Sequence, residues 1–194
     1  MDEASLIRAA QGGSLPAFNQ LILQYQSLAY NVAYRVLGDP DTAADATQEG
    51  FLKAYRALPG FRGGSFKAWL LRIITNTCYD ALRFERRRPA ASLDDLEVEA
   101  DHVPELVQHE ADPLELALRS ELGEAIQQAI QRLPEDQRVT LVLADVEGLA
   151  YQEIAEITGV QLGTVKSRLS RARVRLRDLL MARPELLPQR YRLQ

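Results

Sequence analysis

The chain has 194 residues, 46% of them hydrophobic and 26% charged, and its formal net charge is −4. This composition indicates one globular domain or two small ones, and no apolar run is long enough to cross a membrane. The single cysteine, Cys78, excludes a disulfide framework and a cysteine-cluster zinc site. The acidic N-terminus lacks the apolar core of a signal peptide, so we expect a cytoplasmic protein that needs no metal or other cofactor.

The charge is distributed unevenly along the chain. Residues 1–89 carry a net charge of +3, residues 90–118 carry −9 and residues 119–194 carry +2. The net acidity therefore comes from one central segment and says little about either end. A nucleic-acid-binding surface remains compatible with this sequence.

Two helices are expected in the first 60 residues. Ser14 can cap a helix with a proline in its first turn, and the amphipathic run 18–37 continues it up to Gly38. Asp39 and the proline after it signal a turn and a helix cap, and a second helix is expected over residues 42–58.

A third, longer helix is expected over residues 66–88, after a loop at residues 61–65. Its buried side is predicted to contain Phe66, Leu70, Ile73, Ile74, Thr77, Ala81 and Phe84. Another side gathers cations, an amide and aromatic rings: Trp69, Arg72, Asn76, Tyr79, Arg83 and Arg87. Such a stripe suits contact with unstacked bases and phosphates. The alternative is that the arginines form a solvated helix face and that Trp69 belongs to the core.

The periodic pattern stops in the acidic segment at residues 90–111. This segment is too charged to form a core of its own, so we expect a flexible linker. Both histidines, His102 and His109, lie in it without further His or Cys partners, and no metal site is expected. Helices resume at residues 112–132 and 133–148, and a proline-interrupted tail is expected at residues 183–194. No alternating strand pattern with hairpin turns occurs, so the fold class is all-α.

Residues 151–180 have the pattern of a helix-turn-helix. A short helix at residues 151–158 ends at Gly159, where glycine best tolerates a positive φ. With Ala155 before it and Val165 after it, the spacing favours a second helix that can enter the major groove. The alternative is an ordinary helical hairpin with a solvated basic face. The buried side of the second helix is predicted to contain Leu162, Val165, Leu169, Ala172, Leu176 and Leu179.

Two long motifs resemble regions of one protein family. Residues 45–56, DATQEGFLKAYR, resemble the conserved second-region motif of bacterial sigma factors. Residues 61–63, 66–70 and 73–76 look like the promoter-melting segment of the extracytoplasmic-function (ECF) group. Residues 133–173 are similar to the fourth region of that group. The resemblance covers residues 14–89 and 112–181, with the segments in the family's order.

The resemblance implies a subunit that directs core RNA polymerase to specific promoters and promotes DNA melting, in a stress or signal response. Residues 1–89 would form region 2, which docks on the clamp helices of the β′ subunit and melts the −10 element. Residues 112–182 would form region 4, which sits on the β flap and reads the −35 element. The linker at 90–111 joins them. An anti-sigma factor is a further partner that the resemblance allows.

The resemblance also assigns roles to individual side chains. The polymerase-binding residues would be Asp45, Gln48 and Glu49. The −10 element would be bound by Phe61, Arg62, Gly63, Ser65, Trp69, Arg72, Asn76, Arg83 and Arg87, with a pocket at residues 61–65 for one flipped base. The −35 element would be bound by Thr164, Lys166, Ser167, Ser170 and Arg171.

Gly50 and Ala150 depart from the family pattern. Gly50 lies in mid-helix and Ala150 replaces a common serine cap, and each is expected to cost about 1 kcal/mol of helix stability.

Two rival functions compete with the family assignment. A free-standing transcriptional regulator would use only the helix-turn-helix and leave the residue 45–56 motif unexplained. A thiol hydrolase would need Cys78, which lies on an apolar helix side without a nearby histidine. The chain is therefore not expected to be an enzyme.

Overall fold

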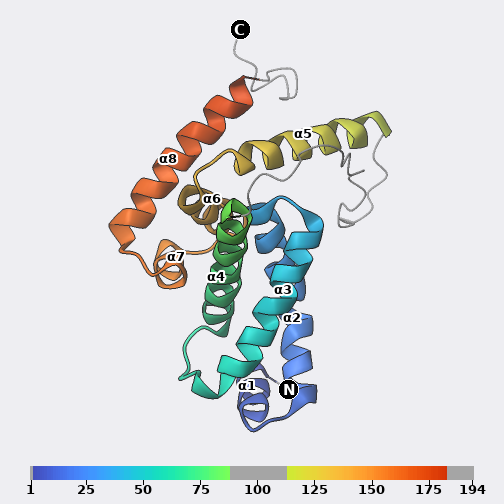
Figure 1. The fold of residues 1–194 in the computed structure, drawn as a ribbon, viewed down its shortest axis with the longest axis vertical. Coiled ribbons are helices and arrows are strands. Elements are labelled where there is room, and N and C mark those ends of the chain that lie inside the picture. Colours follow the sequence, from blue (N-terminus) through green and yellow to red (C-terminus); the bar gives the residue numbers. More distant parts are fainter. Residues whose placement is uncertain (1, 88–112, 183–194) are drawn as a thin grey trace.

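The computed structural model describes residues 2–87 and 113–182, with the side chains of residues 113–120 excepted. The linker expected at residues 90–111, with both histidines, and the tail expected at residues 183–194 lie outside these ranges. Every regular element in the described ranges is a helix, which confirms the all-α fold class. Figure 1 shows the order of the elements, and none of the helices described is long and apolar enough to span a membrane.

The N-terminal half is a bundle of α1 (Glu3–Gln11), α2 (Leu15–Leu37), α3 (Pro40–Ala57) and α4 (Phe66–Arg87), with a short 3-10 turn at Leu58–Gly60. The caps predicted at Ser14 and Asp39 are confirmed, since their side chains accept the N–H groups of Ala17 and Thr42. The helix α1 was not predicted. Its signals are an Asp2 cap, 2.8 Å from the Ser5 nitrogen, and three buried apolar residues.

The buried side predicted for α4 is confirmed only in part. Phe66, Leu70, Ile74 and Thr77 are buried, Ile73 and Ala81 are half-buried, and Phe84 is 62% exposed. The prediction for Phe84 is wrong because Leu82 takes the buried position in the last turns of the helix. The helix contacts α7 as well as α2 and α3, so residues outside the predicted stripe, such as Leu71 and Thr75, are buried too.

Gly50 lies where α3 packs closely on α4. A Cβ atom at this position would lie 2.4 Å from Cδ1 of Ile74, which is fully buried. The sequence indicated only a cost in helix stability, whereas the structure shows that the missing side chain allows the two helices to approach.

The C-terminal half consists of α5 (Pro113–Gln131), α6 (Glu135–Leu141), a π-helical turn (Val142–Val146), α7 (Tyr151–Thr158) and α8 (Leu162–Met181). The predicted helix at residues 133–148 therefore ends in a π turn, where the Glu147 nitrogen donates to the Val142 oxygen. The turn between α7 and α8 is as predicted: Gly159 has a φ of 69°, and Val165, Leu169 and Ala172 are buried. Leu162, Leu176 and Leu179 are half-buried.

The two halves share one hydrophobic core. Buried apolar residues from Leu6 in α1 to Ala172 in α8 form a single cluster. The main contacts between the halves are those of α2 with α5, α6 and the π turn, and those of α4 with α7. Figure 1 shows α7 beside α4, with α5 and α8 above the N-terminal bundle. This closed arrangement of the halves could not be foreseen from the sequence.

Candidate nucleic-acid interface

An apolar groove lies between α2 and α3. It has a volume of about 400 Å³ and is lined by Ile22, Gln26, Ser27, Tyr30, Ala44, Thr47, Gln48 and Phe51. The predicted polymerase-binding residues Asp45, Gln48 and Glu49 are all exposed on α3, and Gln48 lines the groove itself. Glu49 pairs with Lys53 at 2.9 Å. The sequence prediction missed the α2 wall of this groove, because it considered only the motif on α3.

Large apolar side chains are exposed on the same two helices. Leu23 of α2 is 66% exposed and Leu52 of α3 is 52% exposed. An apolar groove with exposed leucines on its two helices is typical of a protein-binding surface rather than of a nucleic-acid-binding one.

The loop before α4 encloses a second cavity, of about 460 Å³. Its walls are residues 60–65 of the loop, Ala68, Trp69 and Arg72 of α4, and Glu156 of α7. The structure thus brings the predicted residues Phe61, Arg62, Gly63, Ser65, Trp69 and Arg72 together around one cavity. Sequence reasoning did not find Glu156, because it belongs to the other half of the chain.

The conformation of this loop depends on glycines and on a helix cap. Gly63 and Gly64 have φ values of 95° and 90°, which other residues rarely adopt. The Ser65 hydroxyl accepts the Ala68 N–H at 3.1 Å and so begins α4. The Phe61 ring lies 5.2 Å from the Trp69 ring, and the Gln11 side chain donates to the Phe61 carbonyl at 2.7 Å. The aromatic wall of the cavity is therefore held in place.

The polar stripe predicted on α4 extends from this cavity toward the C-terminal end of the helix. Arg72, Asn76, Arg83 and Arg87 are all exposed. Only Arg83 has an ion-pair partner among the described residues, Asp80, at 3.5 Å. Tyr79 is half-buried, and burial raises the pKa of its hydroxyl to about 12, so the phenol stays protonated near neutral pH.

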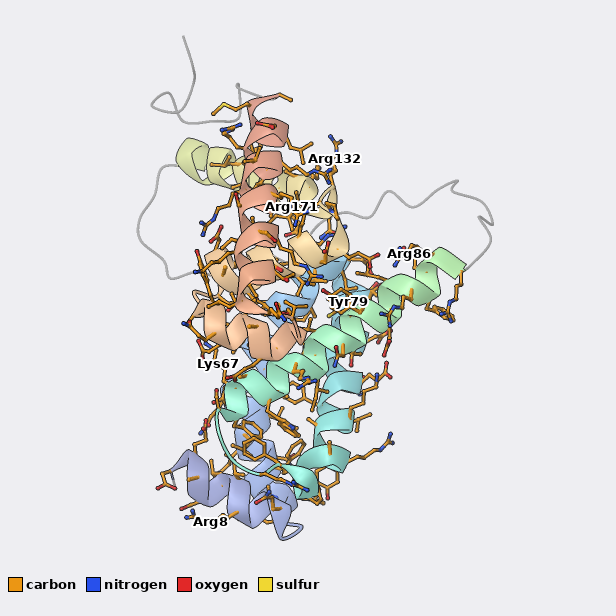
Figure 2. The ribbon with its side chains drawn as sticks, turned by 90° about the vertical axis from the view of Figure 1, so that its left-hand side faces the viewer. Arg8, Lys67, Tyr79, Arg86, Arg132 and Arg171 are labelled. Carbon is orange, nitrogen blue, oxygen red and sulfur yellow. The ribbon has the colours of Figure 1, made fainter. Side chains whose placement is uncertain are left out.

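The predicted reading face of α8 is exposed as well. Lys166, Ser167, Ser170 and Arg171 are exposed, and Thr164 is half-buried. The Arg171 guanidinium folds back over the preceding turn and donates to the Ser167 carbonyl and hydroxyl, both at 3.1 Å. Figure 2 shows Arg171 on α8, above α7 and α4.

Two other arginines of α8 hold the domain together. Arg168 pairs with Asp136, in the first turn of α6, at 3.0 Å. Arg173 makes a bidentate pair with Asp145 of the π turn, at 2.9 and 2.6 Å. Since these two guanidinium groups pair with carboxylates of other elements, Lys166 and Arg171, which have no carboxylate partner among the described residues, are better suited to contact DNA.

Side chains of the C-terminal half cap the end of α2. Gln127 donates to the Tyr34 carbonyl at 3.2 Å, and Gln131 donates to the Arg35 carbonyl at 2.9 Å. Arg138 donates to the Val36 carbonyl at 2.7 Å. We call these three side chains the α2 clasp. The last carbonyls of a helix lack intrahelical partners. The clasp donates hydrogen bonds to carbonyls at the end of α2, and these carbonyls would face water if the two halves separated.

Arg138 is the most deeply placed charge of the clasp. It is 8% exposed, and burial lowers the pKa of its guanidinium. It also donates to the Gln131 side chain at 2.6 Å and to the carbonyls of Gln131 and Leu133. Sequence reasoning did not identify Arg138. The available signal was a charged residue directly before the mostly apolar residues 139–144.

The chain matches two family models at the positions of these surfaces. Residues 21–88 match Sigma-70 region 2, and residues 123–176 match Sigma-70, region 4. The first match includes the groove, the loop cavity and α4. The second includes the clasp and most of the helix-turn-helix.

Curated relatives extend this similarity over most of the chain. The RNA polymerase sigma-H factor of Pseudomonas aeruginosa is 40% identical over 176 residues, which cover 88% of this chain and 90% of that protein. The ECF RNA polymerase sigma-E factor of Escherichia coli is 39% identical over 170 residues, with coverages of 87% and 88%. The ECF RNA polymerase sigma factor SigE of Mycolicibacterium smegmatis is 38% identical over 167 residues, which cover 86% of this chain but only 63% of that protein.

Solved structures show a similar arrangement of helices. CnrH in complex with the cytosolic domain of CnrY has a TM-score of 0.67 and 29% identity, covering 94% of this chain and 99% of that one. The sigma factor RpoE in complex with the anti-sigma factor NepR from Bartonella quintana has a TM-score of 0.64 and 27% identity, with coverages of 84% and 96%. Sequence motifs, region matches and relatives agree, and the chain belongs to the ECF sigma factors of bacterial RNA polymerase.

Proposed function

We propose that this chain directs core RNA polymerase to promoters by using its N-terminal half at the −10 element and its C-terminal half at the −35 element. The observation that carries the proposal is that one chain holds two distinct polar surfaces suited to DNA. One is the loop cavity with the stripe on α4, and the other is the exposed face of α8. A free-standing regulator would need only the second.

The loop cavity and the α4 stripe suit a separated DNA strand. A base that leaves the stack loses a few kcal/mol, which a shaped pocket with hydrogen bonds can return selectively. The cavity offers the Trp69 and Phe61 rings for stacking and the open backbone at Gly63 and Gly64 for base edges. Arg72, Asn76, Arg83 and Arg87 continue from it and would follow the strand's phosphates.

The exposed face of α8 suits the major groove. Lys166 has no hydrogen-bond or ion-pair partner among the described residues, and it can reach the acceptors of guanine. Arg171 can do the same once it leaves Ser167. Thr164, Ser167 and Ser170 are short and fit phosphate contacts that set the register.

The groove between α2 and α3 suits a helix of the polymerase. Its apolar lining and the leucines exposed on the same two helices offer hydrophobic contact, and the exposed polar residues Asp45, Gln48 and Glu49 of α3 offer charge selectivity. In our assignment the partner is the β′ clamp, and region 4 binds the β flap. The similar sigma factor RpoE is bound to an anti-sigma factor in its solved complex, and an anti-sigma factor is a further partner that we propose for the closed form.

The closed arrangement must open for both elements to be read together. Glu156 of α7 lines the −10 cavity, and α8 begins six residues later, so at most about 22 Å of chain separates them. The −10 and −35 elements are about 25 base pairs apart, or about 85 Å of duplex at roughly 3.4 Å per base pair. Polymerase binding would therefore have to separate α7 from α4 and release the α2 clasp.

Catalysis by this chain is not part of the proposal. Cys78 is fully buried, and burial raises the pKa of its thiol to about 12, so no thiolate is available near neutral pH. Polymerase supplies the chemistry, and this chain supplies recognition.

Binding to core polymerase tests the proposal against the free-standing regulator. Purified chain is mixed with core enzyme and analysed by size-exclusion chromatography, with Gln48→Arg placing a charge in the groove. The wild type should co-elute with core and Gln48→Arg should not. Arg56→Ala, an exposed change on α3 outside the groove, is the matched control and should bind normally. A wild-type chain that binds promoter DNA but never core enzyme would contradict the proposal.

A further inference from the structure

A third cavity lies between the two halves of the molecule. It has a volume of about 650 Å³, within the range of small-molecule sites. One wall is α4, with Tyr79, Arg83 and Arg86. The facing walls come from the C-terminal half: residues 133–136, Arg138, Thr158, Val160 and Arg168. Figure 2 shows Tyr79 and Arg86 along α4, beneath the C-terminal helices.

Four guanidinium groups line this cavity against two carboxylates. Arg86 pairs with Glu135 at 2.9 Å and Arg168 pairs with Asp136 at 3.0 Å, while Arg83 pairs at 3.5 Å with Asp80, which lies outside the lining. Arg138 is therefore the guanidinium group of the lining without a carboxylate partner among the described residues. The ion pairs of Arg83, Arg86 and Arg168 each engage one nitrogen atom, while a guanidinium has five N–H donors, so these three side chains keep N–H groups that a ligand could use.

The buried Arg138 adds a positive charge to the cavity wall. It is 8% exposed, and its two terminal nitrogen atoms already donate to groups of this chain. Its Nε–H group is buried without a partner among the described residues, so a ligand in the cavity would interact with the charge of Arg138 rather than accept this hydrogen bond.

The remaining lining is suited to a larger group than an inorganic ion. Leu133, Pro134 and Val160 are apolar, and Tyr79 contributes an aromatic ring whose hydroxyl stays a hydrogen-bond donor at neutral pH, since burial raises its pKa to about 12. Arginines for phosphates, and an aromatic ring with an apolar wall for a base, are the parts of a nucleotide site.

We propose that this cavity binds a nucleotide with two or more phosphate groups and that binding favours the closed arrangement. Phosphate oxygens would accept hydrogen bonds from the guanidinium N–H groups that the ion pairs leave unused. Because the walls come from both halves, a ligand that contacts both binds the closed form better than the open one. The binding and the closure do not depend on the proposed function. Only the consequence, a slower assembly with polymerase, rests on it.

Calorimetry on the free chain tests the binding without polymerase or DNA. The probes are GDP, ADP and inorganic pyrophosphate, with guanosine as the uncharged control at the same ionic strength. At least one diphosphate nucleotide should bind more tightly than pyrophosphate, and guanosine should not bind. Absence of binding by every diphosphate would overturn the site, and pyrophosphate binding as tightly as both nucleotides would overturn the nucleotide assignment.

Two variants locate the binding in this cavity. Arg168→Ala and the exposed Arg83→Ala should each weaken nucleotide binding by about tenfold. Arg175→Ala, an exposed arginine on α8 outside the cavity, should leave it unchanged. Circular dichroism checks that each variant folds. Equal affinity in all three variants would place the nucleotide elsewhere and reject the proposal.

A separate measurement tests whether the nucleotide favours the closed arrangement. In Gln127→Ala, which loses part of the α2 clasp, small-angle scattering should show a larger radius of gyration, and the nucleotide should reduce it. A nucleotide that binds without reducing it would reject the coupling to closure. Failure of these tests leaves the promoter-directing function untouched, and a chain that fails to direct polymerase could still pass them.

Discussion

At the scale of single residues, the α8 side chains divide into those that hold the fold and those that face solvent. Arg168 and Arg173 pair with Asp136 and Asp145 of the same half, whereas Lys166 is exposed without a partner among the described residues. Amphipathic spacing predicted the exposed face correctly. It left Arg168 out of that face, but it could not identify the partner of Arg168, because the position of Asp136 depends on tertiary packing.

Lys166→Ala should weaken binding to the −35 element without affecting folding. A contact that reads a base should cost about 1–3 kcal/mol and relax the preference at one base pair, whereas a phosphate contact should weaken all sequences alike. The measurement is the affinity of holoenzyme for a panel of −35 variants over a salt series. Arg175→Ala on the same helix is the control. Unchanged affinity and selectivity in Lys166→Ala would contradict the assigned DNA face.

Cys78 should resist thiol reagents in the folded protein. Its thiol has an ordinary pKa of 9.0, which burial raises to about 12 in the folded state. The folded state therefore favours the protonated thiol, so this contribution to stability is complete below pH 9 and declines as the pH rises from 9 toward 12. A disulfide reagent at about pH 8 should label Cys78 only at the urea concentrations that unfold the chain. Rapid labelling of the native protein would revive the rival hypothesis of a reactive thiol.

At the scale of elements, helix ends could be predicted from local sequence signals, whereas the irregular elements could not. Ser14, Asp39 and Gly159 mark helix ends through side-chain caps or a positive φ, and these predictions are confirmed. The π turn at Val142–Val146 lies in an apolar run without Gly or Pro, where no local signal distinguishes it from an α-helix. The missed α1 is short, and its stability depends on packing against α2.

In the segment before α4, replacing Gly64 should matter more than replacing Gly60. Gly64 has a φ of 90°, whereas Gly60, which also lines the cavity, is not in the left-handed region. A Cβ atom added at either position would have no heavy atom within 4 Å. The difference between the two positions is therefore backbone strain alone, about 1–2 kcal/mol for Gly64→Ala. Gly64→Ala should impair −10 recognition, and Gly60→Ala should not.

A transcription assay on a library randomised at both promoter elements measures this difference. The −35 preference should stay the same in both variants, because the loop does not belong to the C-terminal half. An unchanged −10 preference and unchanged activity in Gly64→Ala would mean that the flipped base binds elsewhere.

At the scale of the whole molecule, the closed arrangement depends on contacts between residues far apart in the sequence. The clasp joins residues that are 92 to 102 positions apart. No periodicity within a helix contains that information, which is why the sequence predicted two helical halves but not their contact. Glu156 in the loop cavity and Arg138 at the end of α2 are the residues that the structure adds.

Removing one clasp side chain should shift the molecule toward the open form. Gln127 is buried and hydrogen-bonds to Tyr34 and Arg35 of α2, so Gln127→Ala removes contacts between the halves and leaves the backbone of α5 intact. Losing these hydrogen bonds should cost about 1–3 kcal/mol of closure, a shift of about 5- to 150-fold in the closed-to-open ratio. The distance between labelled halves, measured by fluorescence energy transfer, should increase. Glu124→Ala, on the exposed side of α5, should leave it unchanged, and an equal response in both variants would reject the clasp.

The central claim is that this chain confers promoter specificity on core RNA polymerase. The most direct measurement is transcription in vitro with purified core enzyme on a genomic library, followed by mapping of the transcript starts. The account predicts starts that appear only when the chain is added and share one −10 and one −35 sequence at a fixed spacing. Starts that do not depend on the chain, or that share only a −35 sequence without a −10 sequence, would contradict it.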